Sequence, residues 1–517
     1  MVADFVLYNA NVVTLDPHCP EARLVAIRHG KILAVTGDEA PQAFTSPSTV
    51  VIDCQDRTIV PGFNDAHCHL IALAKSMVSL DLSPSKVRSI RDVQKEIGEL
   101  AQGLTQGSWV RGEGYNEFYL AERRHPTRWD LDEATSAHPV KLTHRSGHAH
   151  VLNSLALTLA GISRESTEPP GGIIERDYES GEPNGLLFDM GDVLAERIPS
   201  LADSELDRGM KLAGEKLLSL GITSVQDTSP NTMSQWHLFQ RWKNAGNLKC
   251  RLRLMLGEEG FQQYQDGLLN TQKSGIRFGG VKIVLQETTG RLCPSWQELE
   301  RMVSKVHQSR LQVAIHAVEE TTIEAAYSVL EHVLKKFPRT GHRHRIEHCS
   351  VCPPEMAKRL ASLGVVVVTQ PAFIYYNGER YLKTVVPEQL EHLYPIGTLI
   401  KSGVKVAAGS DCPVAAPNPL VGIYAAVSRK AERGAAILPA ESISPLEALR
   451  LYTEDAAYAS FEEATKGSIT PGKLADLAVL SDNPVKVPVE EIKDLGVEMT
   501  IIGGEVVFRK SFCVIYP

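Results

Sequence analysis

Residues 365–368 read Val-Val-Val-Val, the continuous β-branched run expected of a strand that is buried on both faces. Seven further apolar β runs share this character, at 59–64, 223–226, 251–256, 281–285, 312–316, 344–347 and 404–409. Most gaps between them have a helical pattern, at 205–219, 234–245, 296–309, 320–336, 354–363 and 388–402. Eight strands with intervening helices predict an α/β fold, a (β/α)8 TIM-like barrel. The alternative is a doubly wound open sheet, but no G-x-G-x-x-G follows the first strand.

The two ends of the chain differ from the middle, because both consist of short β-rich runs separated by turn residues. These runs are at 4–15, 24–36, 49–53, 475–480 and 497–508. They predict a small β-sandwich built from residues 1–58 and 464–517, with the barrel at 59–80 and 206–463. Residues 81–205 are then an inserted subdomain. It begins at the rim where barrel enzymes keep their active sites, so we expect a lid or substrate wall; the alternative is an insert for stability or oligomer contacts.

Composition narrows the class of protein. The formal charge of −8 over 517 residues argues against a nucleic-acid or anionic-membrane partner. No stretch approaches 18 uninterrupted apolar residues, and the first residues lack the pattern of a signal peptide. The nine cysteines are scattered and odd in number, which fits a reducing compartment, and we expect a cytoplasmic protein. Cys349 and Cys352 form a C-x-x-C, but no second pair exists to complete a zinc site.

A pair of histidines follows the first apolar run. His67 and His69 are one residue apart, after the turn at Pro61-Gly62. In a strand, residues i and i+2 point to the same side, so both imidazoles could reach one ion. Asp65 could accept a hydrogen bond from one of these rings. The simpler alternative is two polar residues at a strand end.

Further candidate ligands occur at the carboxyl ends of other predicted strands. On one face of a barrel such strand ends converge, although they are far apart in the sequence. Each has a simpler explanation alone; Asp411, for example, could cap the following helix. Together they predict a metal centre. The candidates are His67, His69, Lys282, His316, His348 and Asp411.

This pattern resembles the amidohydrolase superfamily, which has His-x-His after strand one, Lys on strand four, histidines on strands five and six, and Asp on strand eight. Longer stretches resemble the branch that includes the N-substituted formamide deformylases (amidohydrolase family 3). The resemblance covers nearly the whole chain. It rests on residues 147–157 (Gly-His-Ala-His-Val-Leu-Asn-Ser-Leu-Ala-Leu), 221–227 (Gly-Ile-Thr-Ser-Val-Gln-Asp), 409–414 (Gly-Ser-Asp-Cys-Pro-Val) and 466–476 (Lys-Gly-Ser-Ile-Thr-Pro-Gly-Lys-Leu-Ala-Asp).

The resemblance implies a metal-dependent mechanism. One divalent ion, expected to be zinc, would lie between His67, His69 and Asp411, and a second on His316 and His348. Lys282 would bridge them as a carbamate made with carbon dioxide. Hydroxide formed from a shared water would attack a carbonyl, and Asp411 would pass its proton to the leaving nitrogen. The alternative is a single-metal site in which Lys282 is an amine paired with Asp227 or Glu347.

Lys282 also suits this role on its position alone. Within Val281-Lys282-Ile283-Val284-Leu285 its side chain points opposite to Val281, Ile283 and Leu285, and so toward the barrel interior. Burial and neighbouring cations would both lower its pKa and leave an amine able to react with carbon dioxide.

Two departures from the family pattern put substrate preference in doubt. The family's His-Ala-x-Gly-Asp reads His316-Ala-Val-Glu-Glu320 here, and its Asp-Gly near Lys282 reads Gln286-Glu287-Thr288. Glu319 could replace the missing acid and bind substrate; the alternative is a solvated residue at a helix N-terminus.

Other substrate contacts are expected from the insert and from strand seven. His148 could act in catalysis by donating a hydrogen bond to a carbonyl or oxyanion, or could be a structural partner of Asn153. Tyr115 and Trp109 could line a pocket wall or form the insert's own core. Gln370 ends strand seven on the same rim.

The sequence therefore predicts a hydrolase that cleaves a carbon–nitrogen bond in a small, mostly uncharged amide, formamide or cyclic amide. No Arg is clearly placed to bind a charged substrate, although Arg145 and Arg291 remain candidates. Deamination or ester cleavage by the same centre is one alternative, and a non-catalytic regulatory protein on the same scaffold is another. A homodimer is implied by the resemblance alone.

Overall fold

Parallel strands form the central sheet of this computed structural model, which describes residues 2–37, 40–169, 171–265, 275–288, 291–510 and 515–516. Within these residues the sheet has eight strands in the spatial order β23-β22-β21-β20-β17-β16-β15-β8. Strand β23 also lies against β8, so the sheet is a nearly closed barrel, as predicted. The strands are β8 (Phe63–Cys68), β15 (Ile222–Asn231), β16 (Arg251–Leu256), β17 (Ile276–Val284), β20 (Val313–Ala317), β21 (Arg345–His348), β22 (Val366–Thr369) and β23 (Lys405–Ala408).

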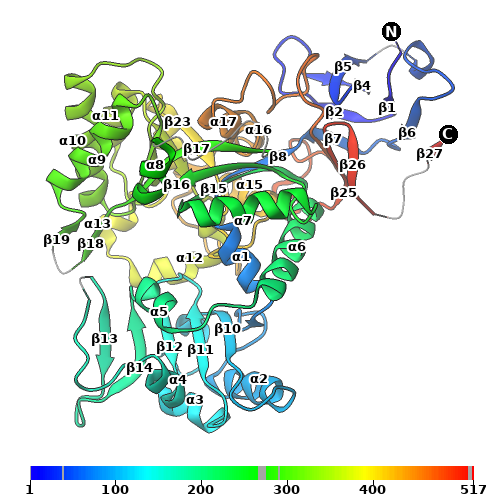
Figure 1. Ribbon diagram of the computed structural model, residues 1–517. Coiled ribbons are helices and arrows are strands. Elements are labelled where there is room, and N and C mark those ends of the chain that lie inside the picture. Colours follow the sequence, from blue (N-terminus) through cyan, green and yellow to red (C-terminus); the bar gives the residue numbers. More distant parts are fainter. Residues whose placement is uncertain are drawn as a thin grey trace. The chain divides into compact units, whose positions relative to one another are not determined.

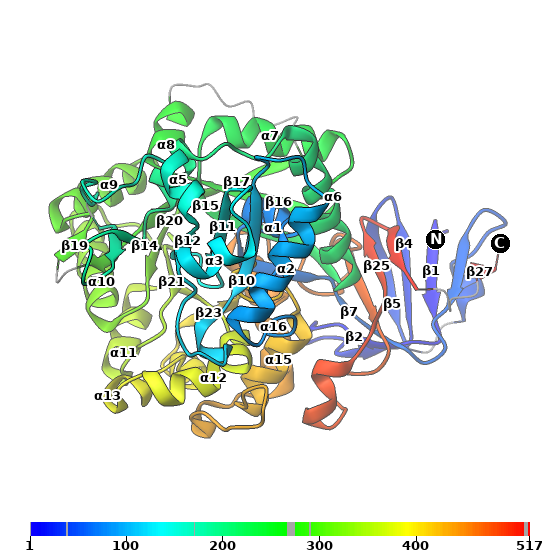
Figure 2. The ribbon, with the colours of Figure 1, turned by 90° about the horizontal axis from the view of Figure 1, so that it is seen from below.

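Helices between these strands cover the outside of the barrel (Figure 2). Some of them begin at a capping residue: the Ser295 hydroxyl accepts a hydrogen bond from the backbone N–H of Glu298 at the start of α9, and the Glu298 carboxylate accepts one from the backbone N–H of Ser295. The helices are α6 (Asp203–Ser219), α7 (Met233–Asn244), α8 (Glu258–Gln265), α9 (Trp296–Gln308), α10 (Glu320–Lys336), α11 (Pro354–Leu363), α12 (Ala372–Thr384), α13 (Pro387–Leu390), α14 (Ile396–Lys401), α15 (Pro419–Ser428), α16 (Pro445–Leu451) and α17 (Glu454–Ala459). A hairpin of β18 (Gln286–Thr288) and β19 (Arg291–Cys293) follows β17.

Two predicted elements are divided in the structure. The run at 59–64 splits at Gly62: β7 (Thr58–Pro61) joins a sheet of the sandwich, and only β8 belongs to the barrel. The helix predicted at 388–402 is two short helices, α13 and α14, with Pro395 as the N-cap of the second. Proline has no N–H to donate and fixes its own φ, so a continuous helix cannot pass through this position.

Both ends of the chain contribute to a β-sandwich, in which the last strands pair with the first ones (Figure 1). Its sheets have the orders β27-β6-β1-β4-β5 and β26-β25-β24-β7-β2-β3. Side chains from both ends, such as Ile27, Leu477 and Met499, share one buried cluster. The strands are β1 (Phe5–Tyr8), β2 (Asn11–Val13), β3 (Glu21–Ala22), β4 (Leu24–Arg28), β5 (Lys31–Thr36), β6 (Val50–Asp53), β24 (Leu477–Leu480), β25 (Val497–Ile502), β26 (Glu505–Arg509) and β27 (Ile515–Tyr516).

A second compact unit comprises Leu70–Ala213 and Cys412–Ala415. Its six-stranded sheet, in the order β13-β14-β12-β11-β10-β9, was not foreseen from the sequence. The bounds 81–205 stay a prediction, as does the role of a lid. The elements are β9 (Leu80–Asp81), β10 (Val110–Tyr115), β11 (Val140–His144), β12 (Ala149–Leu152), β13 (Ile173–Arg176), β14 (Pro183–Phe188), α1 (Leu70–Ser76), α2 (Ile90–Gln102), α3 (Arg128–Ala134), α4 (Ser154–Leu159) and α5 (Gly191–Arg197).

Helix length and composition also bear on membranes. Among the described residues, no helix has both the length and the apolar character that a membrane crossing requires.

A chain of neutral histidines supports the barrel strands near their amino ends. His344 accepts a hydrogen bond from the Val313 backbone N–H through Nδ1 (3.0 Å), and its Nε2 lies 2.8 Å from Nδ1 of His307. His307 in turn donates from Nε2 to the Phe337 carbonyl (2.8 Å). Burial lowers the pKa of His344 well below its usual value. Every ring nitrogen in this chain already has its role as donor or acceptor, so an added proton would break a bond.

We therefore expect acid to destabilise the protein. The unfolded chain takes up a proton at this histidine below about pH 6.5, whereas the folded protein keeps it neutral, so stability falls as the pH drops. Each proton that only the unfolded chain binds adds up to about 1.4 kcal/mol per pH unit to the slope of the free energy of unfolding against pH. Urea unfolding between pH 5 and 8 measures it. The slope should be shallower in His344→Asn and unchanged in His237→Asn, whose histidine is exposed. Equal slopes in the native protein and His344→Asn would refute the argument.

Candidate metal centre

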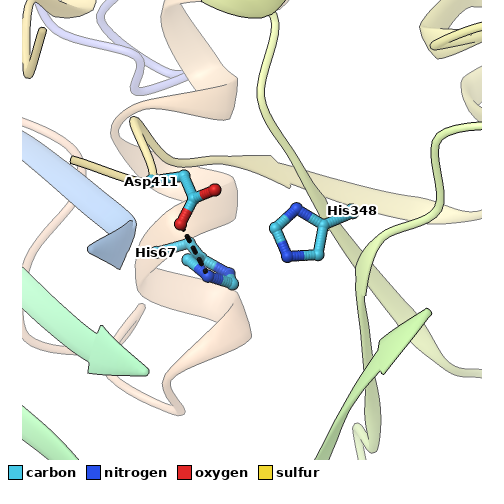
Figure 3. A group of neighbouring side chains, drawn as sticks. All are labelled: His67, His348 and Asp411. Atoms are coloured by element: carbon cyan, nitrogen blue, oxygen red, sulfur yellow. Dashed lines mark ion pairs between the residues drawn. The ribbon is translucent and has the colours of Figure 1, made fainter. Parts of the chain in front are cut away.

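Three of the predicted ligands meet at the carboxyl ends of their strands. His67 is the second-last residue of β8, His348 ends β21, and Asp411 follows β23. Their ligand atoms all lie within 4.8 Å of one another, and all three residues are buried. Figure 3 shows the two imidazoles and the carboxylate around one small space. Three such donors in a buried cluster form a site for a divalent cation.

His69 and His316 extend this cluster on either side. His69 Nε2 lies 2.9 Å from Asp411 Oδ1, while His67 Nε2 is 3.4 Å from the same oxygen. The ring centroids of His316 and His348 are 4.4 Å apart, and those of His348 and His67 are 4.8 Å apart. The four imidazoles and the carboxylate therefore form one continuous group.

Lys282 lies on β17, where it pairs with Ala314 of the neighbouring strand. Its side chain is buried, and Nζ has no hydrogen-bond partner among the described residues. Burial lowers the pKa of Lys282 to about 8, although Glu347 and Asp411 oppose this shift. Lys282 therefore makes no hydrogen bond to Asp227 or Glu347, the carboxylates considered as its alternative partners.

The protonation states suit metal binding. Burial lowers the pKa of His348 to about 3 and that of His316 well below its usual value, so both rings are neutral at pH 7. Burial alone would raise the pKa of Asp411, but the imidazoles of His67 and His69 outweigh it and hold that pKa well below its usual value. His67 Nε2 is buried and has no hydrogen-bond partner within the described part of the chain. Glu347 and Asp411, by contrast, outweigh burial and raise the pKa of His67. The neutral rings of His316 and His348, the ionised Asp411 and the Lys282 amine without a hydrogen-bond partner fit a divalent cation.

Backbone geometry brings these side chains together. Asp411 and His348 have φ of +57° and +71°, a left-handed conformation that is uncommon for residues with a Cβ. Gly409 allows the close approach of the last and first strands, since a Cβ there would lie 2.4 Å from the His67 nitrogen. Asp411 then donates its backbone N–H to the His67 carbonyl (2.7 Å). The barrel thus closes directly at the metal centre.

Three residues that the sequence did not assign to this role hold the imidazoles. The Nδ1 atoms of His67, His69 and His348 lie 2.5, 2.9 and 2.8 Å from their partners. Those partners are Glu347, Ser229 and Gln370 respectively. Each bond leaves the other ring nitrogen, Nε2, for a metal.

The prediction that Asp65 accepts from an imidazole is wrong. Its carboxylate accepts instead from the backbone nitrogens of His67 (3.2 Å) and Ser410 (2.9 Å), and from the Ser410 hydroxyl (2.5 Å). It therefore joins the first and last barrel strands. The carboxylate that accepts a hydrogen bond from an imidazole is that of Glu347 and not that of Asp65.

Gln370 was predicted to bind substrate. It is buried, and its observed partner is the His348 ring. A substrate contact stays a prediction. Glu319 is exposed and is the N-cap of α10, without a side-chain cap bond. Glu319 therefore lies where the alternative interpretation placed it, at the N-terminus of a helix.

The remaining candidates lie in the second unit. Tyr115 is wholly buried in that unit's hydrophobic core, with its hydroxyl 2.9 Å from His125 Nδ1. Trp109 packs against a neighbouring apolar cluster. These surroundings are those of core residues, and substrate contact stays a prediction for both.

His148 is exposed, and its Nδ1 lies 2.7 Å from Asp189 Oδ1. Asn153, the partner considered for it, instead caps α4 through Ala156 and holds the backbone of Val140. The catalytic role of His148 stays a prediction.

The barrel and the His-His-Asp group together define a metal-dependent hydrolase. The model of the amidohydrolase family matches residues 50–508, so the chain belongs to this family. It is an enzyme that acts on carbon–nitrogen bonds other than peptide bonds.

Individual relatives agree with this assignment. The chain is 29% identical to the N-substituted formamide deformylase of Arthrobacter pascens, over 98% of this chain and 99% of the relative. An uncharacterized metal-dependent hydrolase from Pyrococcus horikoshii OT3 has the same fold, with a TM-score of 0.74, 23% identity, and coverage of 94% and 99% of the two chains. An adenosine deaminase from Xanthomonas campestris with bound zinc is more distant, with a TM-score of 0.56, 16% identity, and coverage of 98% and 93%.

Proposed function

We propose that this enzyme hydrolyses the carbon–nitrogen bond of a small, mostly uncharged amide, formamide or cyclic amide. The observation that carries the proposal is the buried group of His67, His348 and Asp411, near a buried Lys282 amine that has no hydrogen-bond partner among the described residues. The similarity to a formamide deformylase over almost the whole chain supports an amide-like substrate. Zinc is the proposed metal, since neutral imidazoles and a carboxylate are among its preferred ligands.

His67, His69 and Asp411 would hold one ion, and His316 and His348 a second, with Lys282 between them. A divalent cation held there would lower the pKa of a bound water toward neutrality and would polarise a carbonyl group. Asp411, an anion at pH 7, would accept the proton released as water adds to the carbonyl carbon, and would deliver it to the leaving nitrogen. The Lys282 amine would add to carbon dioxide and lose a proton, giving a carbamate anion.

The same centre would serve deamination, because water adds to an sp² carbon in both reactions. The fold is shared with a zinc-containing adenosine deaminase, which supports this as the second candidate. A homodimer, a cytoplasmic location and the contacts from the second unit belong to the proposal as predictions only.

A panel of N-formylamines, cyclic amides, aminopurines and esters tests the proposal with the zinc-loaded protein. Amine and acid should be released together from an amide. Ammonia from aminopurines alone would indicate the deaminase. Absence of turnover across the panel would contradict both and favour a regulatory protein.

A further inference from the structure

Glu347 is a wholly buried carboxylate in direct contact with a proposed metal ligand. Its Oε2 accepts a hydrogen bond from Nδ1 of His67 (2.5 Å). Oε1 and Oε2 also accept from Nε (2.6 Å) and Nη2 (3.0 Å) of Arg345, two residues earlier on β21. The carboxylate is thus fixed between a guanidinium and an imidazole.

Arg345 is itself held from two neighbouring strands. Its Nη1 donates to Gln226 Oε1 of β15 (2.6 Å), and its Nη2 donates to the Ala66 carbonyl of β8 (2.7 Å). A buried carboxylate is stable as an anion only when it is paired and hydrogen-bonded. Arg345 meets this condition, because its guanidinium donates two hydrogen bonds to the Glu347 carboxylate.

Two of the other candidate ligand imidazoles, those of His69 and His348, are held differently. His348 contacts a neutral amide oxygen of Gln370, and His69 contacts the neutral hydroxyl of Ser229. An anionic acceptor withdraws the Nδ1 proton more strongly than a neutral one, so it makes the opposite nitrogen a better electron-pair donor. Among the three, His67 alone has an anionic acceptor.

We propose that Glu347, held in place by Arg345, is a positioning residue that fixes His67 as the Nδ1–H tautomer and makes it a stronger metal ligand than His69 or His348. The inference rests on the proposed metal site, and it goes further by assigning unequal strength to the ligands. Glu347 acts through His67 and not on the substrate.

Zinc binding without substrate tests this, by competition with a chromophoric chelator. Glu347→Gln keeps the size of the side chain but removes the charge and turns a donor toward Arg345 or His67. We expect its tightest zinc affinity to fall about 10- to 100-fold, the usual effect of losing such a partner. Ser229→Ala should lower this affinity less.

The matched control is Glu462→Gln. Glu462 is another buried carboxylate of the same unit, paired with Lys466 (2.9 Å) and Arg277 (3.0 Å). Its variant should lose stability and keep the native zinc affinity. Native zinc affinity in folded Glu347→Gln, or an equal loss in Glu462→Gln, would overturn the proposal.

If Glu347→Gln does not fold, Glu347→Asp serves instead, because it retains the charge and shortens the side chain by one methylene. A folded Glu347→Asp should still bind zinc more weakly than the native protein, and native affinity there would overturn the proposal. The outcome is separate from that of the proposed function: a native protein that binds zinc and hydrolyses no amide refutes the function and leaves this test intact.

Discussion

The variants His67→Ala and His348→Ala are expected to lose bound metal and most activity. Each removes an imidazole from a group whose ligand atoms lie within 4.8 Å of one another. Loss of an outer partner costs about 10- to 100-fold in metal affinity or activity, so loss of a ligand should exceed about 100-fold in kcat/KM. Metal content per chain, measured by mass spectrometry after gel filtration, checks the first effect.

Chelation should have the same effect as these substitutions. Activity should disappear with a chelator and return in part with zinc, manganese or cobalt. His237→Ala, at an exposed position of α7, is the control and should retain both metal and activity. Unchanged metal content in both His67→Ala and His348→Ala would remove the basis of the assignment.

The variant Lys282→Ala is expected to lose activity on a similar scale, and short-chain carboxylic acids should restore part of it. The lysine is buried with an unpartnered amine, and burial has lowered its pKa to about 8, so a reactive neutral fraction exists near pH 7 to 8. A small carboxylate such as propionate can occupy the space left by the side chain and supply the missing anion. Activity as a function of propionate concentration, and metal content with and without it, measure the effect.

Lys466→Ala is the matched control, since Lys466 is also buried but pairs with Glu462 and Ser224. It should lose stability without a response to added acid. Full activity of Lys282→Ala with no acid present, or a plain amine in a crystal structure of the metal-loaded enzyme, would refute the carbamate.

The barrel could be predicted from the sequence because its strands are fully buried and therefore appear as unbroken apolar runs, as in Val366–Thr369. The division of the run at 59–64 into two strands at Gly62 could not be predicted. Ile59 and Phe63 are equally buried and differ only in the sheet that they join. The candidate ligands could be named because ligand residue types at strand ends are conspicuous.

Their supporting residues were harder to find. In a regular strand Glu347 and His348 point to opposite faces. If His348 is a metal ligand, this alternation predicts that Glu347 points away from the metal centre. The left-handed φ of His348 ends this alternation and lets both side chains reach His67. A backbone departure of this kind has no signature in residue type. Likewise, the choice between Asp65 and Glu347 as the acceptor depends on tertiary distances alone.

The pairing of β7 with β24 has a consequence for how the chain is made. Strand β7 continues through Gly62 into β8, which carries His67, and its partner in the sandwich begins at Leu477, near the other end of the chain. The Gly62 N–H likewise donates to the Asp476 carbonyl (2.9 Å). During synthesis the histidine-bearing strand therefore leaves the ribosome about 400 residues before β24, one of the two strands that pair with β7. Such a distant contact costs loop-closure entropy and slows folding. The segment that leads into the first candidate metal ligands completes its sheet only after β24 has been translated.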